Sequence, residues 1–212
     1  MKKLVFLFTI LLFLACSENE SKTLKEMKSD KLLSESFTEN ELENLAKIVD
    51  FFDNHISKVT NEENFEKAYT KFLKQDSIRL VDNNEVYRFD YKKQQELYLT
   101  LDTVFFNDFW IKGIGVDNPR SNKEIKYAYF YLNVYNDKGL SKYSKFLSEF
   151  SNDNNFIKKY FELIKVTNAY LNPSSIVDLI LEHNDFDKND VKIKLIYSLH
   201  YLNLNEKYKH LQ

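Results

Sequence analysis

Apolar residues recur at the three- and four-residue intervals of a helix face over most of the chain. The stretch Thr38-Glu39-Asn40-Glu41 fits a capping box, in which Thr38 caps a backbone N–H and Glu41 reaches back to the start of the helix. We therefore predict a helix after Thr38. Its buried face would contain Leu42, Leu45, Ile48, Val49, Phe52 and Ile56.

Further helices follow from the same spacing. Residues 60–63 repeat the capping signature before a second apolar face, and residues 91–111 are predicted to be helical with a break near Asp102. The apolar set of residues 91–111 is Leu97, Leu99, Leu101, Val104, Phe105, Phe109 and Trp110. Towards the C-terminus, helices are predicted over 140–150 and 155–170, after Asn172-Pro173, and from Asp187 or Asn189 onwards.

Two segments interrupt the helical pattern. Residues 113–123 (GIGVDNPRSNK) are predicted to form a loop and a sub-boundary within the domain. Residues 125–135 (IKYAYFYLNVY) alternate tyrosine with other apolar residues, which suits either a buried strand or a buried helix. The helix is favoured because no strand partner is evident. The predicted class is all-α, an irregular bundle or stacked helical hairpins, with a short extended segment around 125–135 as the alternative.

The N-terminus has a different pattern. Met1-Lys2-Lys3 is positively charged, and residues 4–15 are apolar or nearly so. This run of about 12 is short of the roughly 20 residues of a membrane-spanning helix, but it fits the apolar region of a secretory signal. Cys16 follows, and the chain then becomes polar.

These residues resemble the signal of bacterial lipoprotein precursors, in which a small residue precedes an obligatory cysteine. Ala15 matches the small residue, whereas Phe13 and Leu14 depart from the commoner preferences. The resemblance covers residues 1–16 only. It implies removal of residues 1–15 as a signal peptide, cleavage between Ala15 and Cys16, and attachment of lipid, including palmitate, to Cys16. An ordinary cleaved signal with an incidental cysteine is the alternative.

The resemblance also implies a location in the cell envelope. Ser17 stands where an aspartate would favour the inner membrane, so the outer membrane is favoured, on its periplasmic face or at the cell surface. Residues 16–36 are predicted to form a flexible tether with an average reach of about 25 Å. Alternatively, Leu32-Leu33 begins to pack. The helical domain then comprises residues 37–212.

Composition supports a folded helical domain. The chain is 43% hydrophobic and 16% aromatic, enough to fill a core, and its 3 Gly and 2 Pro favour helices over many short strands. The formal net charge is −2, and loss of Lys2 and Lys3 with the signal makes it −4. A mildly acidic chain without a basic run is poorly suited to nucleic acid, which we exclude as a partner.

No motif in the chain predicts a catalytic residue, a metal site or a cofactor. A single cysteine excludes an intrachain disulfide and a cysteine-cluster metal site. The four histidines lack metal-ligand spacing. Residues 185–190 begin like a calcium loop, but Asp190 replaces the required glycine and Ile196 the required glutamate, so a helix-capping turn is favoured.

Aromatic residues offer the best candidates for ligand contact. Phe106, Trp110 and Tyr135 belong to aromatic-rich segments that could line a groove for a peptide or glycan. At helical spacing such residues more often lie in the core, which is the favoured interpretation.

Two functional hypotheses follow. The first is a membrane-anchored envelope module that binds an envelope protein, a peptide or a glycan, including an immunity-type protein that binds an incoming toxin. The second is an envelope hydrolase whose site assembles only in the fold, for example around His55, His183 and His200. The lack of a catalytic motif favours the binding module over an enzyme.

The lipid anchor is directly testable. Cys16→Ala removes the sulfur that would carry the lipid, so it should abolish labelling by radioactive palmitate and retention in the membrane fraction, while the domain stays folded. Palmitate labelling that persists in this variant would contradict lipidation at Cys16.

Overall fold

The computed structural model describes residues 20–81, 90–117, 125–169 and 187–208, and the structural statements below concern these ranges. Helices dominate them, so the all-α prediction is confirmed, with two small antiparallel sheets added. In chain order the elements are α2 (Lys22–Ser29), α3 (Lys31–Ser36), α4 (Glu39–Thr60), α5 (Phe65–Val81), α6 (Tyr91–Thr100), α7 (Thr103–Phe109), β1 (Trp110–Asp117), β2 (Ile125–Leu132), β3 (Tyr135–Asn136), β4 (Gly139–Leu140), α8 (Lys142–Phe150), α9 (Asn155–Thr167) and α11 (Val191–Tyr208).

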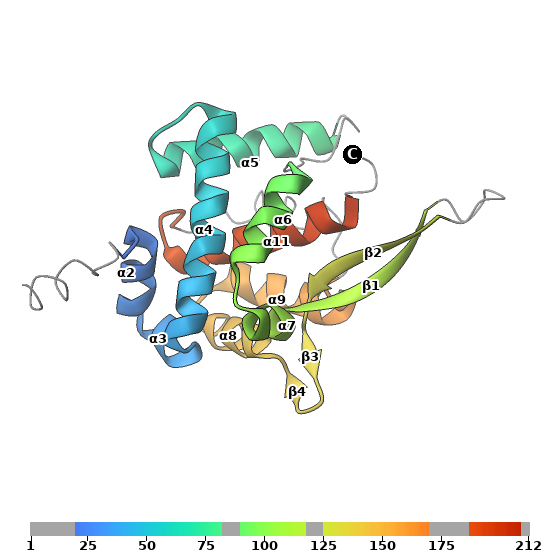
Figure 1. Ribbon diagram of the computed structural model, residues 1–212. Helices are drawn as coiled ribbons and strands as arrows, with labels where there is room; N and C mark the ends of the chain where they lie inside the picture. Colours follow the sequence, from blue (N-terminus) through green and yellow to red (C-terminus); the bar gives the residue numbers. More distant parts are fainter. Residues whose placement is uncertain (1–19, 82–89, 118–124, 170–186, 209–212) are drawn as a thin grey trace, which may run out of the picture.

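The centre of the fold is α11, which crosses the body behind α4 and α6 (Figure 1). Residues 193–206 are all buried, and the helix packs against α2, α4, α6 and β2. A helix that is buried on every side needs a partner for each polar side chain. One such partner is Asp53 of α4, whose carboxylate accepts a hydrogen bond from Lys194 at 3.0 Å and one from Tyr69 at 2.6 Å.

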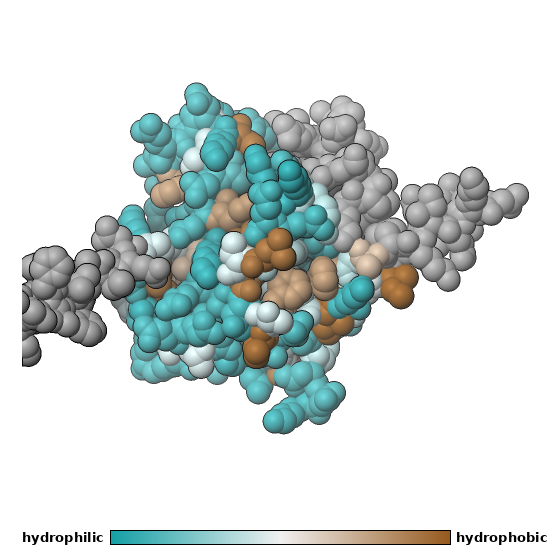
Figure 2. Space-filling view, viewed as in Figure 1, coloured by the Kyte–Doolittle hydropathy of each residue, from teal (hydrophilic) through white to brown (hydrophobic). Residues whose placement is uncertain are grey.

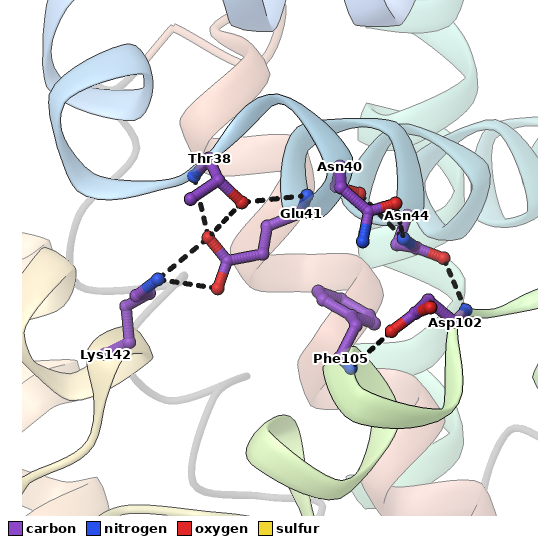
Figure 3. Close-up of polar contacts among 7 residues, drawn as sticks. All are labelled: Thr38, Asn40, Glu41, Asn44, Asp102, Phe105 and Lys142. Carbon is purple, nitrogen blue, oxygen red and sulfur yellow. Dashed lines mark hydrogen bonds and ion pairs between the residues drawn. The ribbon is translucent and has the colours of Figure 1, made fainter.

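The predicted capping box opens α4 and also ties it to α8 (Figure 3). The Thr38 N–H donates to Glu41 Oε2 at 2.6 Å, and the Glu41 N–H donates back to Thr38 Oγ1 at 3.4 Å. Lys142 donates to both oxygens of Glu41, at 2.6 and 2.8 Å. Burial opposes ionisation of this carboxyl, but the hydrogen bonds from Lys142 and Thr38 outweigh it and lower the pKa of Glu41.

The predicted break near Asp102 is confirmed, and α4 holds it in place. The Asp102 N–H donates to Asn44 Oδ1 at 2.8 Å, and Asp102 Oδ1 accepts from the Phe105 N–H (Figure 3). Asp102 Oδ1 also accepts from the Val104 N–H and so caps α7. The helix predicted to reach residue 111 ends earlier, at Phe109, because β1 begins there.

The predicted flexible tether is wrong from Lys22 onwards, where α2 and α3 form instead. Met27 and Leu33 are fully buried, so the alternative in which Leu33 packs is correct. Asp30 caps α3 and also pairs with Lys192 of α11. Ser21 caps α2 by accepting from the Leu24 N–H. Two buried apolar side chains and two helix caps thus fix a segment that is too short and polar to show a clear apolar face.

The helix favoured for residues 125–135 is also wrong, because β1 and β2 form an antiparallel ribbon. Its register runs from Trp110 opposite Leu132 to Asp117 opposite Ile125. The loop predicted over 113–123 is therefore a strand as far as Asp117. Gly113 suggested a loop, yet it makes room for a cross-strand ring, since a Cβ there would lie 2.9 Å from the ring of Tyr129.

Two predicted helix starts shift. Thr60 ends α4, Asn61 adopts a left-handed conformation after it, and Asn64 caps α5 by accepting from the Lys67 N–H at 3.0 Å. At α11 the cap is Asp190, which accepts from the Lys192 N–H. The helices predicted over 140–150 and 155–170 are present as α8 and α9, except that Leu140 belongs to β4 and α9 ends at Thr167. The start predicted at Asn172-Pro173 lies outside the described residues.

Candidate binding surface

An apolar hollow of about 470 Å³ lies between α6, α7 and β2. Figure 2 shows hydrophobic side chains gathered over these elements and over the start of the β1–β2 ribbon. We call this feature the apolar hollow. Its lining residues are Tyr91, Gln95, Tyr98, Leu99, Leu101, Thr103, Phe106 and Phe130.

Three rings from three different elements form its wall. The Phe106 ring lies with its centroid 5.0 Å from that of Tyr98 and 5.1 Å from that of Phe130. Behind it, Trp110 stacks on Phe106 at 5.1 Å with an interplanar angle of 19°. Edge-to-face and stacked contacts of this kind hold aromatic rings in fixed positions. The hollow therefore has a rigid wall before any ligand arrives.

Large exposed apolar side chains lie on the elements that contribute to or adjoin the hollow. Leu99 in the lining is 87% exposed, Val104 on α7 is 70% exposed and Ile114 on β1 is 73% exposed. All three belong to the elements around the hollow and its adjoining ribbon. Clustered exposed apolar residues mark interaction surfaces more often than scattered ones do.

A buried polar network supports the hollow from below. Gln94 of α6 donates to the Tyr98 hydroxyl at 2.7 Å and to the Leu202 carbonyl at 3.1 Å, and it accepts from Asn205 at 2.8 Å. Burial, together with the nearby charge of Glu206, raises the pKa of Tyr98 well above its usual value. Tyr98 therefore stays neutral and acts as a wall of the hollow, not as a base.

Side chains of α11 fix β2, and with it Phe130. The Phe130 N–H donates to Glu206 Oε2 at 3.0 Å, and the Leu132 N–H donates to Asn203 Oδ1 at 3.0 Å. Asn203 in turn donates to the Ala169 carbonyl at 3.0 Å. Asn203 and Glu206 thus occupy the place of a third strand at the edge of β2.

The three predicted aromatic candidates differ in their burial and in their position relative to the hollow. Phe106 lines the hollow. Trp110 is only 3% exposed and stacks on Phe106, so it lies in the core, as the favoured interpretation has it, and offers no surface to a ligand. Tyr135 is 45% exposed on β3 but does not line the hollow. Ala15 and Cys16 lie outside the described residues.

A polar hollow of about 420 Å³ lies near α3 and α8. Two of its lining side chains already have structural partners, since Ser141 caps α8 and Lys142 pairs with Glu41. The lining as a whole mixes acids, amides and lysines: Glu35, Ser36, Asp108, Asn133, Asn136, Ser141, Lys142, Lys145, Phe146 and Glu149.

The hydrolase hypothesis depended on the histidines. Neither His55 nor His200 lines either hollow, and His183 falls outside the described ranges. Within those ranges, no group of three His, Cys, Asp or Glu side chains is arranged to hold a metal ion. The same ranges contain no helix both long and apolar enough to cross a membrane. The calcium-like residues Asp187 and Asp190 accept from nearby backbone N–H groups, as expected for a capping turn.

Known proteins give no guide to this surface: no family model, curated protein or solved structure matches the chain.

His200 makes the stability of the fold depend on pH. It is fully buried beside Tyr160, whose hydroxyl lies 3.4 Å from His200 Nδ1, and burial lowers the pKa of His200 from 6.5 to about 3. Between these values the unfolded chain binds a proton that the folded chain does not. The contribution of the neutral His200 to the free energy of unfolding is therefore fully present above pH 6.5 and is lost progressively as the pH falls towards 3.

His200→Phe should remove this contribution. Between pH 6 and 4, the free energy of unfolding of the variant should fall by about 1.4 kcal/mol less per pH unit than that of the wild type. Urea unfolding at a series of pH values measures both slopes. Tyr135→Phe, at an exposed position, should keep the wild-type slope. A wild-type slope in His200→Phe would contradict the assignment.

Proposed function

We propose that this protein is a membrane-anchored envelope lipoprotein whose helical domain binds a partner polypeptide through the apolar hollow. The observation that carries the proposal is the pre-formed aromatic wall beside Leu99, which is 87% exposed. A partner that covered Leu99 would gain about 1.5–3 kcal/mol from that side chain alone.

The chemistry of the lining favours a polypeptide over a glycan. Its polar groups are limited to Tyr91, Gln95, Thr103 and the hydroxyl of Tyr98, which already accepts from Gln94. None of the lining residues is charged. A glycan presents many hydroxyls that need hydrogen-bond partners when they are buried, whereas an apolar side chain needs only the rings and leucines. An incoming toxin would be one such polypeptide partner.

The proposed anchor has a shorter connection than the sequence pattern indicates. With α2 beginning at Lys22, five residues separate it from Cys16, and five residues span at most about 18 Å. A lipid on Cys16 would therefore hold the domain close to the membrane surface. Ser17 after the cysteine supports the outer membrane as the location.

Site-specific photocrosslinking of the full chain in its own cells tests the binding surface. A benzoylphenylalanine placed at Leu99 should give a discrete protein adduct. The same group at Val166 of α9, an apolar position that is 86% exposed, should not. Phe106→Ala removes one wall of the hollow, so it should reduce the Leu99 adduct about tenfold, the order expected for loss of a central aromatic contact.

The control variant for this experiment is Tyr135→Ala, which removes an exposed aromatic outside the hollow and should leave the adduct unchanged. Equal adducts at Leu99 and Val166, or a Leu99 adduct that survives Phe106→Ala, would contradict binding at the hollow.

A further inference from the structure

The bonding of β2 to α11 determines which way the backbone of β1 faces. In an antiparallel pair, residues opposite each other alternate between those that bond to the partner strand and those that point away from it. The N–H groups of Phe130 and Leu132 point away, because they donate to Glu206 and Asn203. Lys112, opposite Phe130, must then turn its own N–H and C=O away from β2, and so must Ile114, two residues further along.

These outward groups lie on the open edge of the ribbon. At its start, the Trp110 N–H is taken by the Phe106 carbonyl. For Lys112 and Ile114, no described residue bonds to the outward N–H or C=O. Both side chains are exposed, and Figure 1 shows the ribbon leaving the helical body beyond α7. Unpaired edge groups of this kind are a template for another strand.

We propose that the free edge of β1 binds an extended segment of a partner polypeptide as an added strand, with an acidic side chain opposite Lys112 and an apolar one opposite Ile114. The donor and acceptor groups of the two residues recur about 6.6 Å apart, the two-residue repeat of a strand. An extended backbone matches this repeat and can form four hydrogen bonds with it, whereas a helix has already used its own backbone groups.

The side chains specify the chemistry of the partner. Lys112 and Ile114 are two residues apart and therefore share one face of the ribbon. On that face, an added strand places one side chain opposite each of them, and cross-strand pairs of opposite charge or of two apolar groups are favourable. The acidic and the apolar residue of the partner are therefore also two positions apart on one face of the added strand.

The proposal does not rest on the apolar hollow, because β1 contributes no residue to its lining. Phe106→Ala should therefore leave edge binding intact, so failure at one surface is distinguishable from failure at the other.

The test uses the full chain in nanodiscs and a fluorescent, terminally blocked octapeptide, Thr-Glu-Thr-Val-Thr-Glu-Thr-Val, in which glutamate and valine follow each other at two-residue spacing on one face. Fluorescence anisotropy should show saturable binding. Ile114→Pro removes one outward donor and should weaken binding about tenfold, the order of one main-chain hydrogen bond with its local fit. Proline is tolerated where a strand N–H faces solvent, and circular dichroism checks that the variant is folded.

Matched variants separate the contribution of the backbone hydrogen bonds to binding from that of the side chains. Ile114→Thr keeps the N–H and the strand propensity, so it should bind within about threefold of the wild type. Lys112→Glu should weaken the glutamate probe about three- to fivefold and favour a probe with lysine at the same positions. If Ile114→Pro does not fold, slowed hydrogen exchange at the Lys112 and Ile114 amides of the wild type on addition of the probe gives the same answer.

Several outcomes would overturn the proposal. They are the absence of binding at millimolar probe, equal binding by Ile114→Pro and the wild type, and equal loss in Ile114→Pro and Ile114→Thr. Sedimentation that shows a dimer broken only by Ile114→Pro would assign the edge to a second copy of the chain instead.

Discussion

Two hydrogen bonds that the backbone of β2 donates to side chains of α11 fix the position of the β1–β2 ribbon, on which both proposed surfaces depend. Glu206 and Asn203 accept from the N–H groups of Phe130 and Leu132, in place of a neighbouring strand. Both side chains are buried, and leaving either N–H without a partner would cost on the order of 1–3 kcal/mol. A two-stranded ribbon is marginal by itself, so its attachment to a buried helix is what gives it a fixed position.

Both proposed surfaces follow from this attachment. It holds Phe130 against Tyr98 and Phe106, which completes the wall of the apolar hollow. Because strand backbones alternate in direction, it also turns the groups of Lys112 and Ile114 outwards on β1. The attachment of β2 to α11 thus places Phe130 in the lining of the hollow and leaves the outer edge of β1 with outward-facing backbone groups.

The sequence predicts the features that depend on neighbouring residues. The capping box at Thr38 and the break at Asp102 are local signals, and both are present in the fold. The ribbon depends on pairing between residues from 8 (Asp117 and Ile125) to 22 (Trp110 and Leu132) positions apart, which helical spacing does not detect. Gly113 also makes its first strand resemble a loop in the sequence. The apolar set predicted for residues 91–111 includes Leu99 and Val104, yet both are exposed, since the break at Asp102 divides this segment into the two short helices α6 and α7. Phe106 is the candidate that aromatic content alone could identify, whereas the role of Asn203 and Glu206 carries no sequence signal, since polar residues at the end of a helix usually face solvent.

Amide hydrogen exchange of the ribbon tests the central role of α11 most directly. The N–H groups of Lys112, Ile114, Phe130 and Leu132 all point away from the β1–β2 ladder, so they differ mainly in whether α11 binds them. Phe130 and Leu132 should exchange at least about 100-fold more slowly than Lys112 and Ile114, since their opening requires release from a buried helix. Equal exchange rates for the four amides would contradict the account.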